Sequence, residues 1–192
     1  MPAVPLFPLQ ILPIPGELVP LHIFEPRYRQ LLHDAETVDI EIGILLRHPE
    51  NTRNVGSMVR LERIIRKYPG GESDIVVRCH DFFSLDRYFS VFRDKLYPGG
   101  EVRIAGEELN QMAGLPLVLK FSAYLERLKR AHRSGIISVF HIAAAMNLDI
   151  KERLAFAELS ALRRESYLDS RIGYQMKLID AEERSKDVFH LN

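Results

Sequence analysis

Residues 6–28 read Leu-Phe-Pro-Leu-Gln-Ile-Leu-Pro-Ile-Pro-Gly-Glu-Leu-Val-Pro-Leu-His-Ile-Phe-Glu-Pro-Arg-Tyr, and this stretch determines how the first half of the chain folds. Its five prolines exclude a helix before the last of them, because proline lacks a backbone donor and has a fixed φ. The apolar residues between the prolines still need burial, so we expect irregular β structure that pairs where its donors allow. Pro26 suits the first position of a helix, and helix-forming residues follow it. The sequence therefore predicts a change from extended to helical structure at Phe24-Glu25-Pro26-Arg27-Tyr28.

The composition is that of an ordinary globular protein with one large domain or two small ones. Of 192 residues, 46% are hydrophobic and 27% are charged, with 26 basic and 26 acidic side chains. This balance gives no basic surface for strong sequence-independent binding of nucleic acid. A single cysteine, Cys79, excludes an internal disulfide framework and fits a reducing compartment. The chain shows no basic leader segment and no apolar run of about 20 residues, so we expect a cytoplasmic protein without a membrane span.

The first half of the chain has the pattern of β structure up to about residue 104. Strand-like runs occupy residues 40–46, 56–65, 75–77 and 88–92. The pentapeptide Tyr-Pro-Gly-Gly-Glu occurs twice, at residues 68–72 and 97–101. We expect both copies to form hairpin turns, because proline presets φ and glycine accepts a positive φ. Neither copy is followed by the lysine and hydroxyl residue that a phosphate-binding loop requires.

The second half of the chain has helical periodicity. Apolar residues recur at helical spacing over 117–128 and 136–146, then from a cap at Asn147 or Asp149 to about residue 164, and finally beyond Ser166 or Asp169. Strands followed by helices predict an α+β protein rather than an alternating α/β one. We expect a β domain over residues 1–108 and a helical subdomain over residues 112–192.

Several segments together resemble a known family. They are Leu6-Phe7-Pro8-Leu9, Pro15-Gly16, the run from Pro20 to Tyr28, Gly43-Ile44, residues 55–59, residues 147–154 and residues 178–184. This pattern resembles the N-terminal, substrate-binding domain of Lon ATP-dependent proteases over nearly the whole chain. The resemblance implies a PUA-like β pseudo-barrel followed by a C-terminal helical bundle. It also implies recognition of unfolded or tagged polypeptides and a part in assembling the protease.

The sequence lacks the motifs of the other two Lon domains. It contains no Gly-x-x-x-x-Gly-Lys-Ser/Thr loop for ATP and has no room for a Ser-Lys peptidase domain. We therefore expect a stand-alone, non-enzymatic polypeptide-binding protein that needs no cofactor. Its expected partners are exposed apolar segments of other chains, and a separate ATPase or protease chain is a further candidate. An edge strand of the β half is one place where an extended peptide could add.

The candidate binding residues are those of the family motif, Phe24, Glu25, Pro26, Arg27 and Tyr28. We expect part of their role to be structural. Phe24 and Tyr28 are expected in the core, because burying an aromatic ring is favourable. Glu25 and Arg27 are two positions apart and would not face each other on a helix, so each is expected to pair with another group.

Cys79 and His80 carry an alternative interpretation, a small-molecule-binding or hydrolytic module with a pocket beside them. Adjacent residues of a strand point to opposite faces, which favours a buried, inert thiol beside a surface histidine. His22 and Glu25 have a spacing that binds metal only on a helix, and Pro26 places both before one. We therefore expect no metal site.

Two basic clusters leave open a third interpretation, an RNA-binding PUA-like module. Their members are Arg60, Arg63, Arg66 and Lys67 in one, and Arg127, Lys129, Arg130 and Arg133 in the other. Glu62 and Glu126 dilute the two clusters, so a solvated charged face is the favoured interpretation.

Overall fold

The computed structural model describes residues 1–106, 111–130 and 137–189, with side chains to residue 182. It divides into two compact units, Met1–Leu109 with Leu148–Glu158, and Asn110–Asn147 with Leu159–Asn192. The chain therefore leaves the first unit, contributes to the second, and returns before its C-terminal helix.

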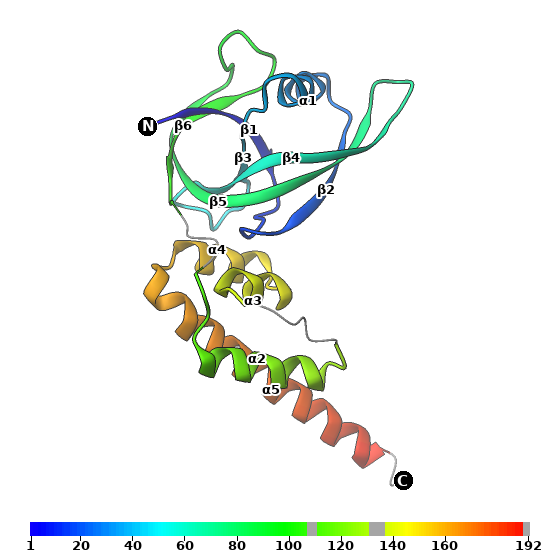
Figure 1. Ribbon diagram of the computed structural model, residues 1–192, viewed down its shortest axis with the longest axis vertical. Helices are drawn as coiled ribbons and strands as arrows, with labels where there is room; N and C mark the ends of the chain where they lie inside the picture. The colour runs from blue at the N-terminus through cyan, green and yellow to red at the C-terminus, as the bar shows by residue number, and fades with distance from the viewer. Residues whose placement is uncertain (107–110, 131–136, 190–192) are drawn as a thin grey trace. The chain divides into compact units, whose positions relative to one another are not determined.

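The strands of the first unit close into a ring (Figure 1). They are β1 (Ala3–Leu9), β2 (Leu18–Ile23), β3 (Ile42–Leu46), β4 (Val55–Lys67), β5 (Ser73–Phe89) and β6 (Gly99–Ile104). Their order is β2-β5-β4-β3-β1-β6, and β6 also pairs with β5, which closes the sheet. Among the strands that the structure describes, β1 and β3 pair in parallel and the other pairs are antiparallel. The predicted α+β class, a β pseudo-barrel followed by helices, is confirmed.

The longest strand, β5, pairs with a different strand along each of its two ends. Its first part, from Ser73 to Arg78, pairs with β2, and its last part, from Phe83 to Phe89, pairs with β6. Register shifts between β4 and β5 bend this pair of strands, as β-bulges do. The sequence predicted two separate runs here, and the structure joins them in a single strand that ends at Phe89.

The interior of the ring is filled by one cluster to which the ring strands contribute. Its buried members are Val4, Leu6, Met58, Phe83 and Val102, with Leu45, Leu85 and Ile104 partly buried against them. Phe83 occupies this space because glycines face it. A Cβ added at Gly56 would lie 2.3 Å from the Phe83 ring and 2.5 Å from the Ile44 carbonyl oxygen.

Helix α1 (Pro26–Val38) packs on a second apolar cluster and begins where the sequence predicts. Pro26 is at its first turn and Glu25 is the N-cap residue. Its buried side chains are Tyr28, Leu31, Leu32 and Ala35. Asp39, with φ of 48°, takes the left-handed conformation that ends the helix.

The two copies of Tyr-Pro-Gly-Gly-Glu have different structures. The copy at residues 68–72 is a hairpin turn between β4 and β5, with Gly71 at φ 91°, as predicted. The copy at residues 97–101 is not a turn, because Gly99 and Gly100 begin β6. A Cβ at Gly99 would lie 2.1 Å from Phe92, so the second copy needs glycine for close packing instead of for a positive φ.

Helix α4 (Ile150–Glu158) belongs to the first unit, although it lies far along the chain. A capping box starts it: the Glu152 amide donates to Asp149 at 2.9 Å and the Asp149 amide donates to Glu152 at 3.0 Å. Asp149 is thus one of the two caps that the sequence proposed. The helix ends at Glu158, so the predicted continuation to residue 164 is wrong.

The second unit contains α2 (Leu115–Arg127), α3 (Val139–Ala145) and α5 (Ala161–Phe189). Three pairs of contacts run in the same chain direction along α2 and α5, which makes these two helices parallel. They join Gly114 to Glu165, Lys120 to Asp169, and Arg127 to Asp180. Among the helices that the structure describes, none combines the length and the apolar character needed to cross a membrane.

Candidate functional site: the free edge and outer face of β2

The five residues of the predicted motif separate into a buried part and an exposed part. Tyr28 is buried, with its ring centroid 4.1 Å from that of Phe7. Phe24 is 57% exposed, so the prediction that it belongs to the core is wrong. Phe24 directly follows Ile23, the inward-facing last residue of β2, and alternation along the chain turns its ring to the outside.

Glu25 and Arg27 pair with each other, contrary to the expectation from helical spacing. The Arg27 guanidinium donates to the Glu25 carboxylate, with the shorter N–O distance at 2.7 Å. The pair forms because Glu25 precedes the helix in an extended conformation and only Arg27 is helical. The Arg27 guanidinium also lies 4.6 Å from the centroid of the Tyr28 ring. Burial raises the pKa of the Tyr28 hydroxyl, and the charge of Arg27 opposes that rise.

One edge of β2 carries no paired strand among the described residues. The Cys79 amide donates to the Glu17 carbonyl, and in the antiparallel register this places the backbone groups of residues 19, 21 and 23 toward β5. Leu18, Pro20 and His22 therefore direct their backbone groups to the free edge. Pro20 is tolerated there because its missing donor is not needed by β5.

The same residues form an exposed face that is rich in apolar atoms. The side chains of Leu18, Pro20 and His22 are exposed along β2, and Phe24 extends the row. The His22 and Phe24 rings are stacked, with centroids 6.0 Å apart, and the Tyr68 ring approaches His22 by its edge at 6.0 Å. We call Leu18, Pro20, His22 and Phe24 the β2 face.

A hydrogen-bonded network holds the end of the β2 face in place. His22 Nδ1 is 2.7 Å from one carboxylate oxygen of Asp74, and the Tyr68 hydroxyl donates to the other at 2.6 Å. These hydrogen bonds, that of Tyr68 first, lower the pKa of the Asp74 carboxyl. The guanidinium of Arg66 lies 4.7 Å from the Tyr68 ring centroid. Sequence reasoning considered His22 only as a metal ligand, and nothing in the sequence indicates its pairing with Asp74, 52 residues away.

Arg29 joins helix α1 to the first Tyr-Pro-Gly-Gly-Glu turn. Its guanidinium donates to the Gly70 carbonyl at 2.8 Å and to the Glu72 carboxylate at 3.1 Å. The turn that carries Tyr68 is thereby fixed to the helix that follows Phe24. This contact joins the Phe24–Tyr28 motif to the Tyr68–Glu72 turn.

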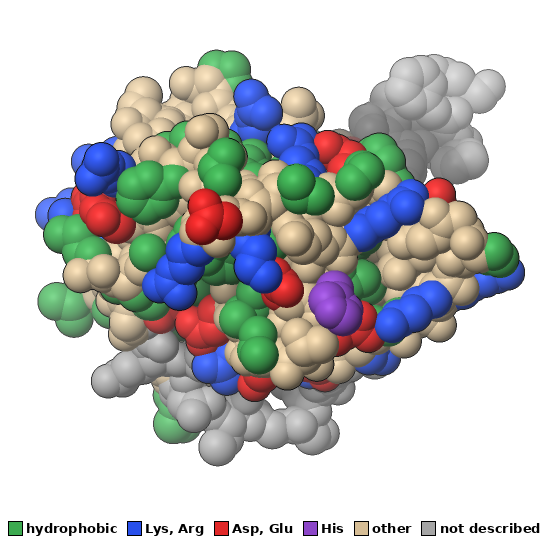
Figure 2. All heavy atoms as spheres, turned by 90° about the horizontal axis from the view of Figure 1, so that it is seen from above, with side chains coloured by type: hydrophobic (Ala, Val, Ile, Leu, Met, Phe, Trp, Pro, Cys, Tyr) green, Lys and Arg blue, Asp and Glu red, His purple; other side chains and the backbone are tan. Residues whose placement is uncertain are grey.

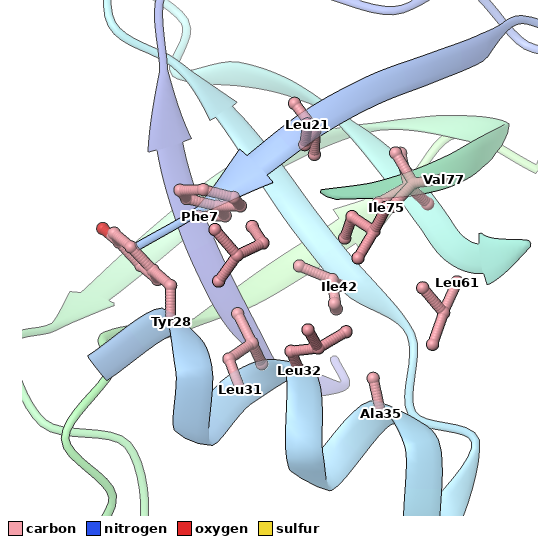
Figure 3. Close-up of a pocket in the computed structure, with 12 residues that line it drawn as sticks. Phe7, Leu21, Tyr28, Leu31, Leu32, Ala35, Ile42, Leu61, Ile75 and Val77 are labelled. Carbon is pink, nitrogen blue, oxygen red and sulfur yellow. The ribbon is translucent and has the colours of Figure 1, made fainter. Parts of the chain in front are cut away.

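Beneath α1 lies a small apolar cavity, which the helix nearly fills. Figure 3 shows Tyr28, Leu31, Leu32 and Ala35 pointing from the helix toward side chains of the strands. Its free volume is about 10 Å³, which is about the space of one water molecule. The cavity is therefore part of the core and offers no room for a ligand.

The residues of the hydrolytic alternative face different surroundings. Cys79 is completely buried, and its Sγ lies 3.4 Å from the Pro13 carbonyl oxygen. Burial raises the pKa of this thiol, so the reactive thiolate is disfavoured. His80 Nε2 lies 3.4 Å from the Glu41 carboxylate, and burial lowers the pKa of the His80 ring. The predicted opposite orientation of the two side chains thus agrees with their contacts.

Three members of the two basic clusters, Arg60, Lys67 and Arg127, form ion pairs with acidic side chains. Arg60 pairs with Glu41 at 2.6 Å and Lys67 pairs with Glu36 at 2.7 Å. In the second cluster Arg127 pairs with Asp180, and Arg133 lies outside the described residues. Figure 2 shows blue and red side chains interspersed over the visible face of the described chain. Among the described residues, no group of three or more His, Cys, Asp or Glu side chains is placed to hold a metal ion.

A closed, mixed β ring with α1 packed against it and helices following it defines an α+β protein of the pseudo-barrel class. Residues 3–168 match the family model of the ATP-dependent protease La (LON) substrate-binding domain. The chain therefore belongs to this family. A search of curated proteins gave no significant match.

Two solved structures share the fold. A Lon N-terminal domain protein from Xanthomonas campestris superposes with a TM-score of 0.69 at 20% identity, covering 91% of this chain and 99% of that one. The N-terminal domain of a Mycobacterium avium complex Lon protease gives a TM-score of 0.60 at 15% identity, covering 90% of this chain and 98% of that one. At these identities the likeness concerns the fold alone.

Proposed function

We propose that this protein binds unfolded polypeptides, or exposed apolar segments of other chains, along β2. The observation that carries the proposal is the coincidence of a free strand edge with the β2 face. Membership in the Lon substrate-binding domain family supports the same class of ligand. In this proposal the motif residues have two roles. Phe24 contacts the ligand, and Pro26 and Tyr28 hold helix α1 in place.

Strand addition fits the backbone geometry of this edge. An extended peptide forms main-chain hydrogen bonds with an exposed strand edge, and its alternate side chains meet the neighbouring face. At the free edge, Leu18 and His22 each offer a donor and an acceptor, and Pro20 offers an acceptor alone. Such bonds do not depend on the ligand's side chains, which suits a protein that accepts many sequences.

The β2 face supplies the preference for apolar ligands. Leu18 and Phe24 are 45% and 57% exposed, so both keep apolar surface that a ligand could cover. Burying apolar surface contributes about 25 cal/mol per Å², so a few aliphatic side chains on Phe24 give useful affinity. The fixed network of Asp74, His22 and Tyr68 keeps the aromatic rings in position and lowers the entropy cost of binding.

The protein would act by binding and without a cofactor. The buried, protonated Cys79 thiol favours this view over the hydrolytic alternative, and the ion pairs of Arg60 and Lys67 favour it over RNA binding. We place the protein in the cytoplasm, where a lone reduced thiol is stable. We propose that a separate ATPase or protease chain receives the bound polypeptide. Co-purification of this protein with such a chain tests whether the two associate.

The decisive experiment measures binding of a labelled unfolded protein. Carboxymethylated lysozyme carrying a fluorophore is titrated with the full chain. The fluorescence anisotropy of the lysozyme should rise and reach a plateau at about micromolar concentrations of the added protein. Phe24→Ala and Leu18→Lys should each weaken binding about tenfold, because they remove apolar contact on the β2 face.

Tyr88→Ala is the matched control for Phe24→Ala. Tyr88 is also an exposed aromatic residue, at 50%, but it lies on β5 beyond the part that pairs with β2. The Tyr88→Ala variant should bind unfolded lysozyme with the affinity of the unchanged protein. Absence of saturable binding, or equal losses for Phe24→Ala and Tyr88→Ala, would refute the proposal. Binding that weakens steeply with salt and prefers RNA would instead support the RNA-binding alternative.

A further inference from the structure

A concave site on the first unit has no residue of β2 in its lining. It is a groove of about 470 Å³, within the size range of ligand-binding clefts. Three parts of the chain line it: the start of β1, the end of α1 with the following connection, and the segment between β5 and β6. The lining residues that matter here are Ala3, Val38, Ile40, Phe92 and Tyr97, together with the charged side chains discussed below.

The backbone of β1 is open toward this groove. Residues 3–5 pair with β6, but pairing with β3 starts only at Leu6. The Leu6 amide donates to the Pro98 carbonyl and the Pro2 carbonyl accepts from Val102, so backbone groups of even-numbered residues face β6. Ala3 therefore directs its amide and its carbonyl to the other side, where the described chain places no strand beside it.

The charges in the groove cancel. Asp34 and Glu41 are acidic, and Arg93 and Lys95 are basic. Lys95 Nζ lies 2.9 Å from the Asp34 carboxylate, which also accepts a 2.7 Å hydrogen bond from the Tyr97 hydroxyl. Glu41 is paired with Arg60 outside the groove. An anionic ligand would compete with Asp34 for Lys95, and a cationic ligand would compete with Lys95 for Asp34, so the Lys95–Asp34 pair favours a neutral ligand.

An exposed valine and one turn with a strained backbone lie at the groove. Val38 on one rim is 68% exposed. Arg93 and Asp94, on the opposite side, are consecutive non-glycine residues with φ of 46° and 61°. Such conformations persist only where the surroundings hold them, and they gather at ligand-binding segments. The Leu96 amide donates to Gln30 at 2.7 Å, which fixes this segment to α1.

We infer that the groove binds a short, extended, uncharged peptide segment that pairs with Ala3 and seats small apolar side chains against Ile40 and Phe92. The inference rests on the proposed function, because the ligand is again polypeptide, but it assigns a site separate from the β2 face. Two such sites on one unit would hold two segments of the same unfolded chain. Linked binding of this kind raises the affinity beyond that of either site.

The test locates binding of a short peptide on the ¹⁵N-labelled full chain by NMR. The probe is acetyl-Val-Ala-Val-Ala-amide, and saturable shifts are expected at the amides of Ala3, Val38 and Leu96. A version of the probe with alternate amides N-methylated should bind about tenfold more weakly, because it cannot donate to the Ala3 carbonyl. Thr37→Trp, which places a large ring in the groove, should abolish these shifts.

His33→Trp is the matched control, since His33 is exposed on the same helix and does not line the groove. It should leave the shifts unchanged. Shifts confined to residues of the β2 face, or no shifts at millimolar probe, would overturn this inference. If the protein still binds unfolded lysozyme in that case, the proposed function stands. If the unchanged protein does not bind unfolded lysozyme, the proposed function itself is refuted. Equal loss of probe binding in Thr37→Trp and His33→Trp would also overturn the groove assignment.

Discussion

Glu17 and Arg153, which are 136 residues apart, form a bidentate ion pair within the first unit. Arg153 Nη1 and Nη2 donate to the two Glu17 oxygens at 2.6 and 2.9 Å. Arg153 also donates to the carbonyls of Leu12 and Leu148, and Glu17 accepts from the Ile14 amide. The pair thus attaches α4 to the proline-rich segment that leads into β2. It links the N-terminal part of the chain to residues 147–154, and both parts contribute to the family resemblance.

Arg153→Ala should destabilise the first unit by about 2–3 kcal/mol, because it leaves the mostly buried Glu17 carboxylate without its partner. The free energy of unfolding from urea denaturation measures this loss. Arg78→Ala is the control: its pair with Glu62 is exposed, so the expected loss is below about 1 kcal/mol. Similar losses for the two variants would contradict a special role of Arg153.

A fragment of residues 1–108, the β domain proposed from the sequence, should be less stable than the full chain. It lacks α4 and with it Arg153, Leu154 and Phe156, of which the last two are buried. Adding a synthetic peptide of residues 147–159 should raise the melting temperature of the fragment. If the fragment unfolds at the same urea concentration as the first unit of the full chain, α4 is dispensable.

Two glycines of the ring should differ in their tolerance of alanine. At Gly56 the added methyl group meets the Ile44 carbonyl oxygen at 2.5 Å as well as the Phe83 ring, and the backbone cannot move aside easily. At Gly43 it meets only side chains, Leu6 at 2.8 Å and Phe83 at 3.1 Å. Gly56→Ala should therefore cost more than about 3 kcal/mol and Gly43→Ala about 1–2 kcal/mol. Thermal unfolding ranks the two, and the reverse order would contradict this packing.

Cys79 should not react with Ellman's reagent in the folded protein. Burial raises the pKa of its thiol, so the folded chain keeps this proton to a higher pH than the unfolded chain does. The stability that the protonated thiol contributes is present below the ordinary thiol pKa and is lost as the pH rises above it. Labelling at pH 8 should follow the rate of unfolding, and fast labelling without denaturant would show that the thiol is accessible.

Tyr97→Phe should raise the pKa of Asp34. Burial alone would raise this pKa, but hydrogen bonds from Lys95 and Tyr97 outweigh burial and lower it. A lowered carboxyl pKa stabilises the fold above the ordinary aspartate pKa, and that contribution is lost as the pH falls through the folded-state value. Removing the hydroxyl should cost about 1 kcal/mol at neutral pH. Carboxyl NMR titration measures the shift, and Tyr68→Phe, which alters Asp74 instead, should leave Asp34 unchanged.

The sequence predicted those features that depend on local backbone chemistry. Pro26 starts α1, Asp149 caps α4 and Gly71 forms a hairpin turn, each for a reason contained within a few residues. Pro20 likewise lies on an edge strand, as a missing donor requires. The class of fold followed from the change of period between the two halves of the chain.

The features that depend on distant partners were missed. Whether an aromatic ring is buried depends on what packs over it, and residue type alone does not distinguish exposed Phe24 from buried Tyr28. The contacts His22–Asp74 and Glu17–Arg153 join segments that carry no common pattern. The second Tyr-Pro-Gly-Gly-Glu copy shows the same limit, because Phe92 and the neighbouring strands decide its structure.

The interrupted course of the chain through its two units has a consequence for synthesis on the ribosome. The six strands emerge first, yet the guanidinium that neutralises Glu17 is translated only after much of the helical unit has been made. Until then the nascent ring holds an unpaired carboxylate and an uncovered apolar surface, the condition in which chaperones engage new chains. A protein proposed to hold unfolded polypeptides would thus pass through a long unfinished stage of its own.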